Sequence, residues 1–121
     1  MTKLKRAGFF RELRHGFPEG PSLRDSIPQS GAKAAAPLVA YLSNAPVLLF
    51  TRGVVRDFLE PGTVIGPPHI RTDGVWCWPS DLAYYVEKYS CQIPEEFASY
   101  MKARNWRPPR DEDVNFGEVE L

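Results

Sequence analysis

The chain has 121 residues, which is enough for one well-cored domain and too few for two. Hydrophobic residues make up 43% of it and charged residues 25%, the balance of a folded globule rather than of a disordered chain. Fifteen basic and fifteen acidic side chains give a net charge of zero, which argues against a general nucleic-acid coat because such a protein needs a basic excess.

Residues 7–15 predict a helical turn that buries Phe9 and Leu13, which are four positions apart, and that ends at Gly16. Residues 16–31 hold three glycines and three prolines, and we interpret them as an ordered but irregular loop. A structureless loop of this length is uncommon in a small domain, so we expect it either to wrap the surface or to serve a purpose.

Residues 32–43 are rich in alanine, the residue most favourable to a helix. Because proline is tolerated in the first turn of a helix and not in its interior, Pro37 predicts that the helix begins near Ala36 or kinks there. Residues 46–51 are continuously apolar and predict a buried central strand. Residues 54–59 then predict a short helix.

The clearest local signal is the Asp73-Gly74 pair between two runs of residues that favour strands. Such a pair predicts a β-hairpin whose two turn residues both have positive φ. Alternation along the second strand places Trp76 and Trp78 on one face and Cys77 on the other.

Two amphipathic helices are predicted after the hairpin. Ser80 is the expected N-cap of the first, and Asp81 is expected to face outward at the positive end of the helix dipole. The apolar positions of this helix are Leu82, Tyr85, Val86 and Tyr89. Pro94 opens the second helix, whose apolar stripe is Ile93, Phe97, Tyr100 and Met101.

This order of elements predicts an α+β fold. We expect a three- or four-stranded, mostly antiparallel sheet that includes the Asp73-Gly74 hairpin, with helices packed on one face. Residues 1–121 are expected to form a single domain. Residues 111–121 form an acidic tail, and the sequence leaves open whether this tail is ordered or flexible.

No catalytic constellation is evident. His15 and His69 have no cysteine or carboxylate at metal-ligand spacing, so we expect neither a metal site nor a cofactor. Cys77 fits core packing, and a Cys77–His69 nucleophile pair across the hairpin has no third group to orient it. We therefore expect no enzymatic activity, and a small enzyme that uses Cys77 or His69 stays as an alternative.

Basic and aromatic side chains also suggest a stacking surface for nucleic acid. The residues that suggest it are Arg11, Arg14, Arg71, Arg107 and Arg110, together with Phe10, Trp76 and Trp106. The neutral net charge counts against this interpretation. A small regulatory or nucleic-acid-binding module therefore stays as the second hypothesis.

The apolar content and the N-terminus also bear on the compartment. No apolar run approaches the roughly 20 residues that cross a bilayer, and the first residues lack the apolar stretch of a secretion signal. The two cysteines lie fourteen positions apart and make no disulfide framework. We therefore expect a cytoplasmic protein with reduced thiols and no membrane partner.

Several segments resemble a group of small bacterial proteins. They are GFFRELRHG at residues 8–16, GPSLRDSI at 20–27, RTDGVWCWPSDLAYYVEKY at 71–89, IPEEF at 93–97 and RPP at 107–109. Proteins of this size and type often accompany polymorphic or contact-delivered toxins as immunity partners. The resemblance implies an immunity protein that covers the active face of a cognate toxin, and it assigns no role to any residue.

Twelve prolines, about twice the usual share of roughly 5%, predict rigid connections and a pre-organised surface. Such a surface suits the binding of a protein partner. The residues expected to contact it are Arg71, Asp73 and Trp78 near the hairpin, Trp106, and the acidic set Asp111, Glu112 and Asp113. The acidic set is expected to cover a basic groove of the toxin by electrostatic complementarity.

Overall fold

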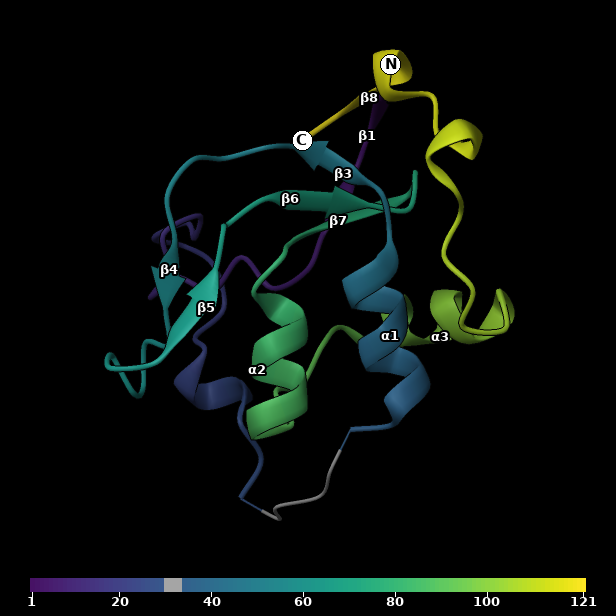
Figure 1. Cartoon of the computed structure of the whole chain (residues 1–121). Coiled ribbons are helices and arrows are strands. Elements are labelled where there is room, and N and C mark those ends of the chain that lie inside the picture. Colours follow the sequence, from purple (N-terminus) through teal and green to yellow (C-terminus); the bar gives the residue numbers. More distant parts are fainter. Residues whose placement is uncertain (30–33) are drawn as a thin grey trace.

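The computed structural model describes residues 1–29 and 34–121 and has an α+β fold (Figure 1). Its main sheet has four strands in the order β2-β7-β6-β3. These are β2 (Lys5–Arg6), β3 (Val47–Leu49), β6 (Ile70–Thr72) and β7 (Trp76–Pro79). Strands β3, β6 and β7 pair antiparallel, whereas β2 runs parallel to β7. The predicted α+β class is therefore confirmed, with a mixed sheet rather than a purely antiparallel one.

The other strands of the described residues form two smaller sheets. Strand β1 (Thr2–Lys3) pairs parallel with β8 (Val119–Glu120), so the two ends of the chain lie on the same side of the molecule (Figure 1). Strand β4 (Val55–Arg56) pairs antiparallel with β5 (Val64–Gly66). Three 3-10 helices also occur, at Arg24–Ser26 (η1), Asp111–Asp113 (η2) and Phe116–Glu118 (η3). Residues 111–121 thus contain η2, η3 and β8.

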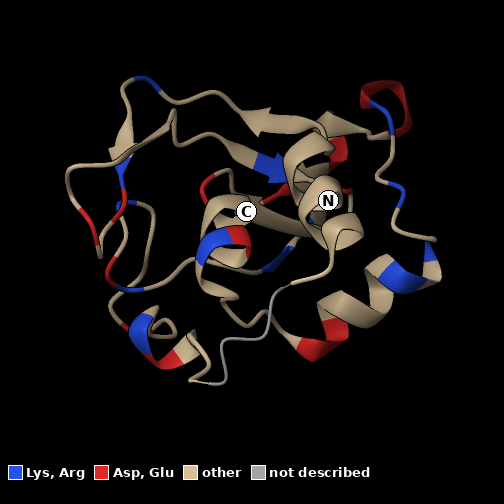
Figure 2. Ribbon diagram, turned by 60° about the horizontal axis from the view of Figure 1, so that its bottom comes forward, with Lys and Arg blue, Asp and Glu red and all other residues tan. Residues whose placement is uncertain are grey.

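The described residues form three α-helices, α1 (Ala36–Asn44), α2 (Leu82–Tyr89) and α3 (Glu95–Ala103). Helices α1 and α2 lie side by side, and α3 packs against α1 (Figure 1). Helix α1 carries no charged side chain, whereas α3 begins with acidic residues and ends near a lysine (Figure 2). In the described part of the chain, no helix is long and apolar enough to cross a membrane.

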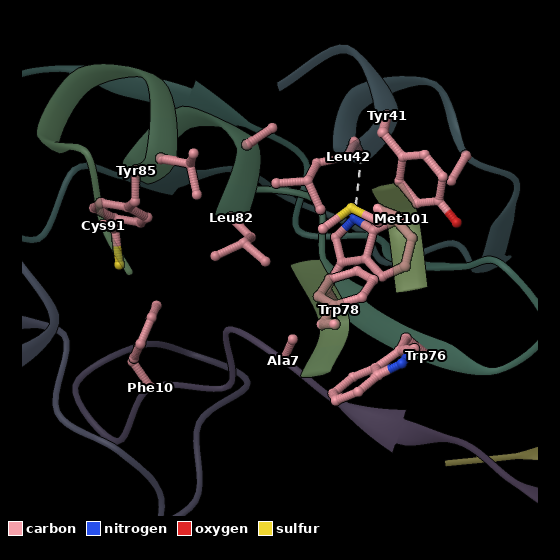
Figure 3. Close-up of a cluster of buried hydrophobic side chains, with 14 of the residues drawn as sticks. Ala7, Phe10, Tyr41, Leu42, Trp76, Trp78, Leu82, Tyr85, Cys91 and Met101 are labelled. Carbon is pink, nitrogen blue, oxygen red and sulfur yellow. Dashed lines mark hydrogen bonds between the residues drawn. The ribbon is translucent and has the colours of Figure 1, made fainter. Parts of the chain in front are cut away.

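The main core lies between the helices and one face of the sheet (Figure 3). Trp76 and Trp78 both point into it, as the alternation along β7 predicts. The Trp76 ring stacks on Phe97 of α3, with the ring centroids 4.8 Å apart. The indole Nε1 of Trp78 donates a hydrogen bond to the Leu42 carbonyl of α1 at 3.0 Å. The aromatic side chains of β7 therefore join the sheet to two helices.

A smaller core covers the opposite face of the sheet. Cys77 and Ile70 point into it, and Leu4 and Phe9 from the N-terminal segment pack on them. Val119 of β8 packs on the same cluster. The N-terminal segment and the C-terminal strand thus cover the face that the helices leave open.

The predicted helical turn at residues 7–15 is wrong. Residues 11–15 form turns instead. Gly8 has a φ of +77°, which is outside the helical region, and the backbone N–H of Arg11 donates to the carbonyl of Pro21 rather than to a residue one turn earlier. The predicted helix at residues 54–59 is also wrong, since β4 lies there. Asp57 ends this strand, because its Oδ1 accepts the backbone N–H groups of Leu59 and Glu60, two and three positions later.

The predicted central strand at residues 46–51 is β3, and it is an edge strand. Leu49 is 49% exposed and Phe50 is 75% exposed, so this apolar run is not buried. The start of α1 at Ala36, with Pro37 in the first turn, is as predicted. The predicted loop and helix meet at residues 30–33, which lie outside the described residues.

The hairpin and the start of α2 differ from the predictions in detail. In the turn, Gly74 has positive φ and Asp73 does not, because the Asp73 carboxylate closes the turn by accepting two backbone N–H groups. Ser80 does not cap α2, since its hydroxyl donates to the carbonyl of Pro67. Asp81 is buried rather than facing outward, with 4% of its surface exposed.

Candidate functional site

Two of the predicted contact residues, Asp73 and Trp78, are buried inside the fold. Trp78 is fully buried. Asp73 is 5% exposed, and its carboxylate accepts a hydrogen bond from the Tyr41 hydroxyl at 2.7 Å as well as those of the turn. Arg71 is half-buried and donates to the Ala45 carbonyl at the end of α1. These side chains hold the hairpin against α1, so Asp73 and Trp78 offer no surface to a partner.

The other predicted contact residues lie toward the C-terminus. Asp111, Glu112 and Asp113 form η2 and are exposed, and the Arg110 guanidinium pairs with the last two of them at 2.8 and 3.4 Å. Trp106 is half-buried just after α3, with a left-handed φ of 58°. Among the described residues, no hydrogen bond or ion pair joins this set to the hairpin residues, although Trp106 packs against the main core that contains Trp78.

Neither Cys77 nor His69, the residues of the enzyme alternative, is exposed in the structure. Cys77 is fully buried, and burial raises the pKa of its thiol to about 12. The thiol is therefore protonated and unreactive at neutral pH. His69 accepts the backbone N–H of Thr51 at Nδ1, and its ring packs against Phe50 at 5.1 Å.

A cleft of about 430 Å³ lies between the end of β2, the loop of residues 17–26 and the connection from α2 to α3. Its volume is in the range of pre-formed binding pockets, roughly 300–1,000 Å³. The walls are mainly apolar, and the exposed charged residues Arg6 and Glu19 also line it. The apolar wall residues are Phe9, Phe10, Phe17, Pro21, Ile93 and Pro94.

Three of the segments that carry the resemblance meet at this cleft. Eight of its thirteen lining residues belong to residues 8–16, 20–27 or 93–97. The backbone joins the segments directly, because Arg11 donates to the Pro21 carbonyl at 2.9 Å and Gln92 donates to the Ser26 carbonyl at 2.7 Å. The cleft is thus the place where segments far apart in sequence form one surface.

Glu12 holds the loop side of the cleft in position. Its carboxylate accepts the backbone N–H groups of Leu23 and Arg24 at 2.8 and 3.1 Å and the hydroxyl of Ser22 at 2.9 Å. Burial alone raises the pKa of Glu12, but these hydrogen bonds outweigh it and lower the pKa below its usual value. Leu23 is fully buried in the main core, so the loop is fixed at both its backbone and its side chains.

Two glycines allow the loop to approach the N-terminal segment closely. A Cβ on Gly16 would lie 1.8 Å from the Phe10 carbonyl oxygen, and one on Gly20 would lie 2.8 Å from that of Phe9. No larger residue fits at Gly16 without moving the backbone. Gly16 and Gly20 therefore help to define the shape of this part of the loop.

The residues of this cleft are absent from the set of contact residues predicted from the sequence. The available signal was the clustering of the resembling segments together with the glycines of the loop. The sequence could not show that these segments meet in the fold, because the residues that join them, such as Gln92 and Ser26, are 66 positions apart.

Comparisons with family models, curated proteins and solved structures found no match to this chain. The geometry of the cleft and its surroundings is therefore the basis for the function proposed below.

Proposed function

We propose that this chain is a non-enzymatic binding protein, an immunity protein that neutralises a cognate bacterial toxin in the cytoplasm by covering its active face. The observation that supports this proposal is the pre-formed apolar cleft between the N-terminal segment and the loop of residues 17–26. The resemblance to small bacterial proteins adds to it.

A pre-formed cleft favours tight association with a protein. Its loop is fixed by Glu12 and by the close approach at Gly16, so little conformational entropy is lost on binding. Protein interfaces gain most of their affinity where an apolar group enters a water-excluding pocket surrounded by polar residues. The apolar walls and the charged residues Arg6 and Glu19 match this arrangement.

The contact surface proposed here keeps part of the predicted set. Trp106 and the acidic residues of η2 have solvent-accessible side chains and can add contacts outside the cleft. Asp73 and Trp78 are left out, because their side chains are buried in the fold.

Co-expression with the product of the adjacent gene tests the proposal. We expect a stable 1:1 complex by size-exclusion chromatography and rescue of growth when that product is toxic. Replacing the wall residue Phe17 by serine should weaken both, whereas Arg56→Glu, at an exposed position of β4 that does not line the cleft, should weaken neither. Absence of complex and rescue with every neighbouring toxin would refute the proposal.

Binding of nucleic acid is the second candidate. The observation that favours it is a group of exposed basic side chains near the N-terminus, namely Lys3, Lys5, Arg6, Arg11, Arg14 and Arg24. A gel-shift series over salt separates the candidates. Affinity that falls steeply with salt supports nucleic-acid binding, and no shift at low salt removes it.

A further inference from the structure

The walls of the cleft determine which kind of group can fill it. Phe9 and Phe10 are buried, and the half-buried Phe17 packs on Phe9 with the ring centroids 5.7 Å apart. Ile93 and Pro94 also line the cleft. Aromatic and aliphatic walls favour an apolar occupant, because a polar group that enters them loses its hydrogen bonds to water.

The charges around the cleft are not balanced. Glu96 pairs with Lys5, and Asp25 lies 4.0 Å from Arg11, whereas the Glu12 carboxylate keeps its negative charge because its hydrogen-bond donors are neutral. The remaining exposed charged residues of the surrounding segments are the basic Lys3, Arg6, Arg14 and Arg24 and the acidic Glu19 and Glu95. With Glu12 included, residues 1–29 and 92–97 carry six basic and five acidic side chains, a net charge of +1. This small excess, together with Arg6 in the cleft wall, favours an acidic partner.

Arg6 is placed to recognise that acid. Its guanidinium lies over the ring of Phe17, 4.4 Å from the centroid, so it is held at a wall of the cleft. A guanidinium stacked by its face keeps its N–H edge available, and that edge matches a carboxylate with two parallel hydrogen bonds.

We propose that the cleft receives an apolar side chain of the partner, and that Arg6 binds a carboxylate next to that side chain. This inference rests on the proposed function, and it names the recognised element as an aromatic or branched aliphatic residue flanked by Asp or Glu. A negatively charged segment of this kind is complementary both to the walls and to the surrounding charge.

Short capped peptides test the inference without the toxin. The probe is Asp-Glu-Phe-Asp-Glu, and its matched controls are Lys-Lys-Phe-Lys-Lys and Asp-Glu-Ala-Asp-Glu. In a titration followed by amide NMR, we expect the probe to shift the resonances of Phe9, Phe17 and Ile93 to saturation. Its Kd should be lower than that of either control by about tenfold, the effect of one charge-assisted hydrogen bond or one buried apolar group.

Two variants test whether Arg6 recognises the acidic residues of the probe. Arg6→Glu should remove the preference for the acidic probe, and Arg56→Glu, the matched reversal away from the cleft, should retain it. Circular dichroism and the Tm establish that both variants are folded. Equal affinity for all three peptides, shifts confined to residues outside the cleft, or tighter binding of a single-stranded oligonucleotide at the same resonances would overturn the inference.

The outcomes also separate this inference from the proposed function. A toxin complex that forms equally well with Arg6→Glu refutes the role of Arg6 and leaves the proposed function standing. Selective peptide binding without any toxin complex supports the recognition chemistry and refutes the immunity function.

Discussion

Asp81 carries a charge that the fold does not accommodate well. Its side chain lies just before the first residue of α2 but makes no capping hydrogen bond, and its Oδ1 atom has no partner among the described residues. Burial raises the pKa of Asp81 from its usual 3.8 to about 6, and the nearby His15 offsets this only in part. An ionised Asp81 should therefore destabilise the folded state.

The size of the effect follows from the pKa. Each pKa unit corresponds to about 1.4 kcal/mol, so the rise from 3.8 to about 6 means that ionised Asp81 costs the fold about 3 kcal/mol at neutral pH. Because the folded-state pKa lies above the unfolded-state value, the cost is absent below about pH 3.8. The cost grows as the pH rises from about 3.8 to about 6 and is complete above 6, and the free energy of unfolding falls over the same range.

Asp81→Asn removes the charge and keeps the shape. We expect the variant to be more stable than the wild type by up to about 3 kcal/mol at pH 7.5, with the difference approaching zero near pH 4. Urea denaturation followed by tryptophan fluorescence at the two pH values measures it. The exposed Asp111→Asn is the matched control and should show little difference at either pH. A variant that is less stable at pH 7.5, or a difference independent of pH, would refute the reasoning.

Three further changes test other parts of the fold. Asp57→Asn should lower the free energy of unfolding by about 3 kcal/mol at pH 7, because the buried carboxylate accepts hydrogen bonds from two tyrosines and two backbone N–H groups. Burial raises the pKa of Asp57, but these hydrogen bonds outweigh burial and lower the pKa from 3.8 to about 2. Ionised Asp57 therefore stabilises the folded state fully above pH 3.8, and this stabilisation is lost as the pH falls through 2. Gly16→Ala should destabilise the protein severely in thermal denaturation, whereas Gly62→Ala, with nothing within 4 Å of the added Cβ, should leave the Tm within a few degrees. Glu12→Gln should cost about 1–2 kcal/mol in urea denaturation and weaken binding of the acidic peptide, because the loop is held less firmly; unchanged peptide affinity would contradict the role of Glu12.

Local patterns in the sequence predicted α1, α2, α3 and the hairpin, although they also predicted helical structure at residues 7–15 and 54–59 that does not form. The spacing of Leu82, Tyr85 and Val86 predicts the buried face of α2, and all three are buried. Pro37 in the first turn marks the start of α1. These features depend on residues close together in the chain, which is why periodicity and propensity can predict them.

The features that sequence patterns missed depend on distant partners. Strand β2 pairs with β7 about 70 positions later, and no local signal specifies this pairing. Asp57 and Glu12 act through carboxylates that accept hydrogen bonds from backbone N–H groups, a role that cannot be told from ordinary surface charge in the sequence. The cleft depends on such contacts, so its position could not be predicted although three of its segments were singled out.

The two thiols lie on opposite sides of the main sheet, with Cys77 in the smaller core and Cys91 in the larger one. Each is nearly inaccessible to solvent, so an alkylating reagent reaches it only when the core around it opens. Two single-cysteine versions of the chain would consequently report, by their labelling rates, whether the layers on the two sides of the sheet separate together or one before the other.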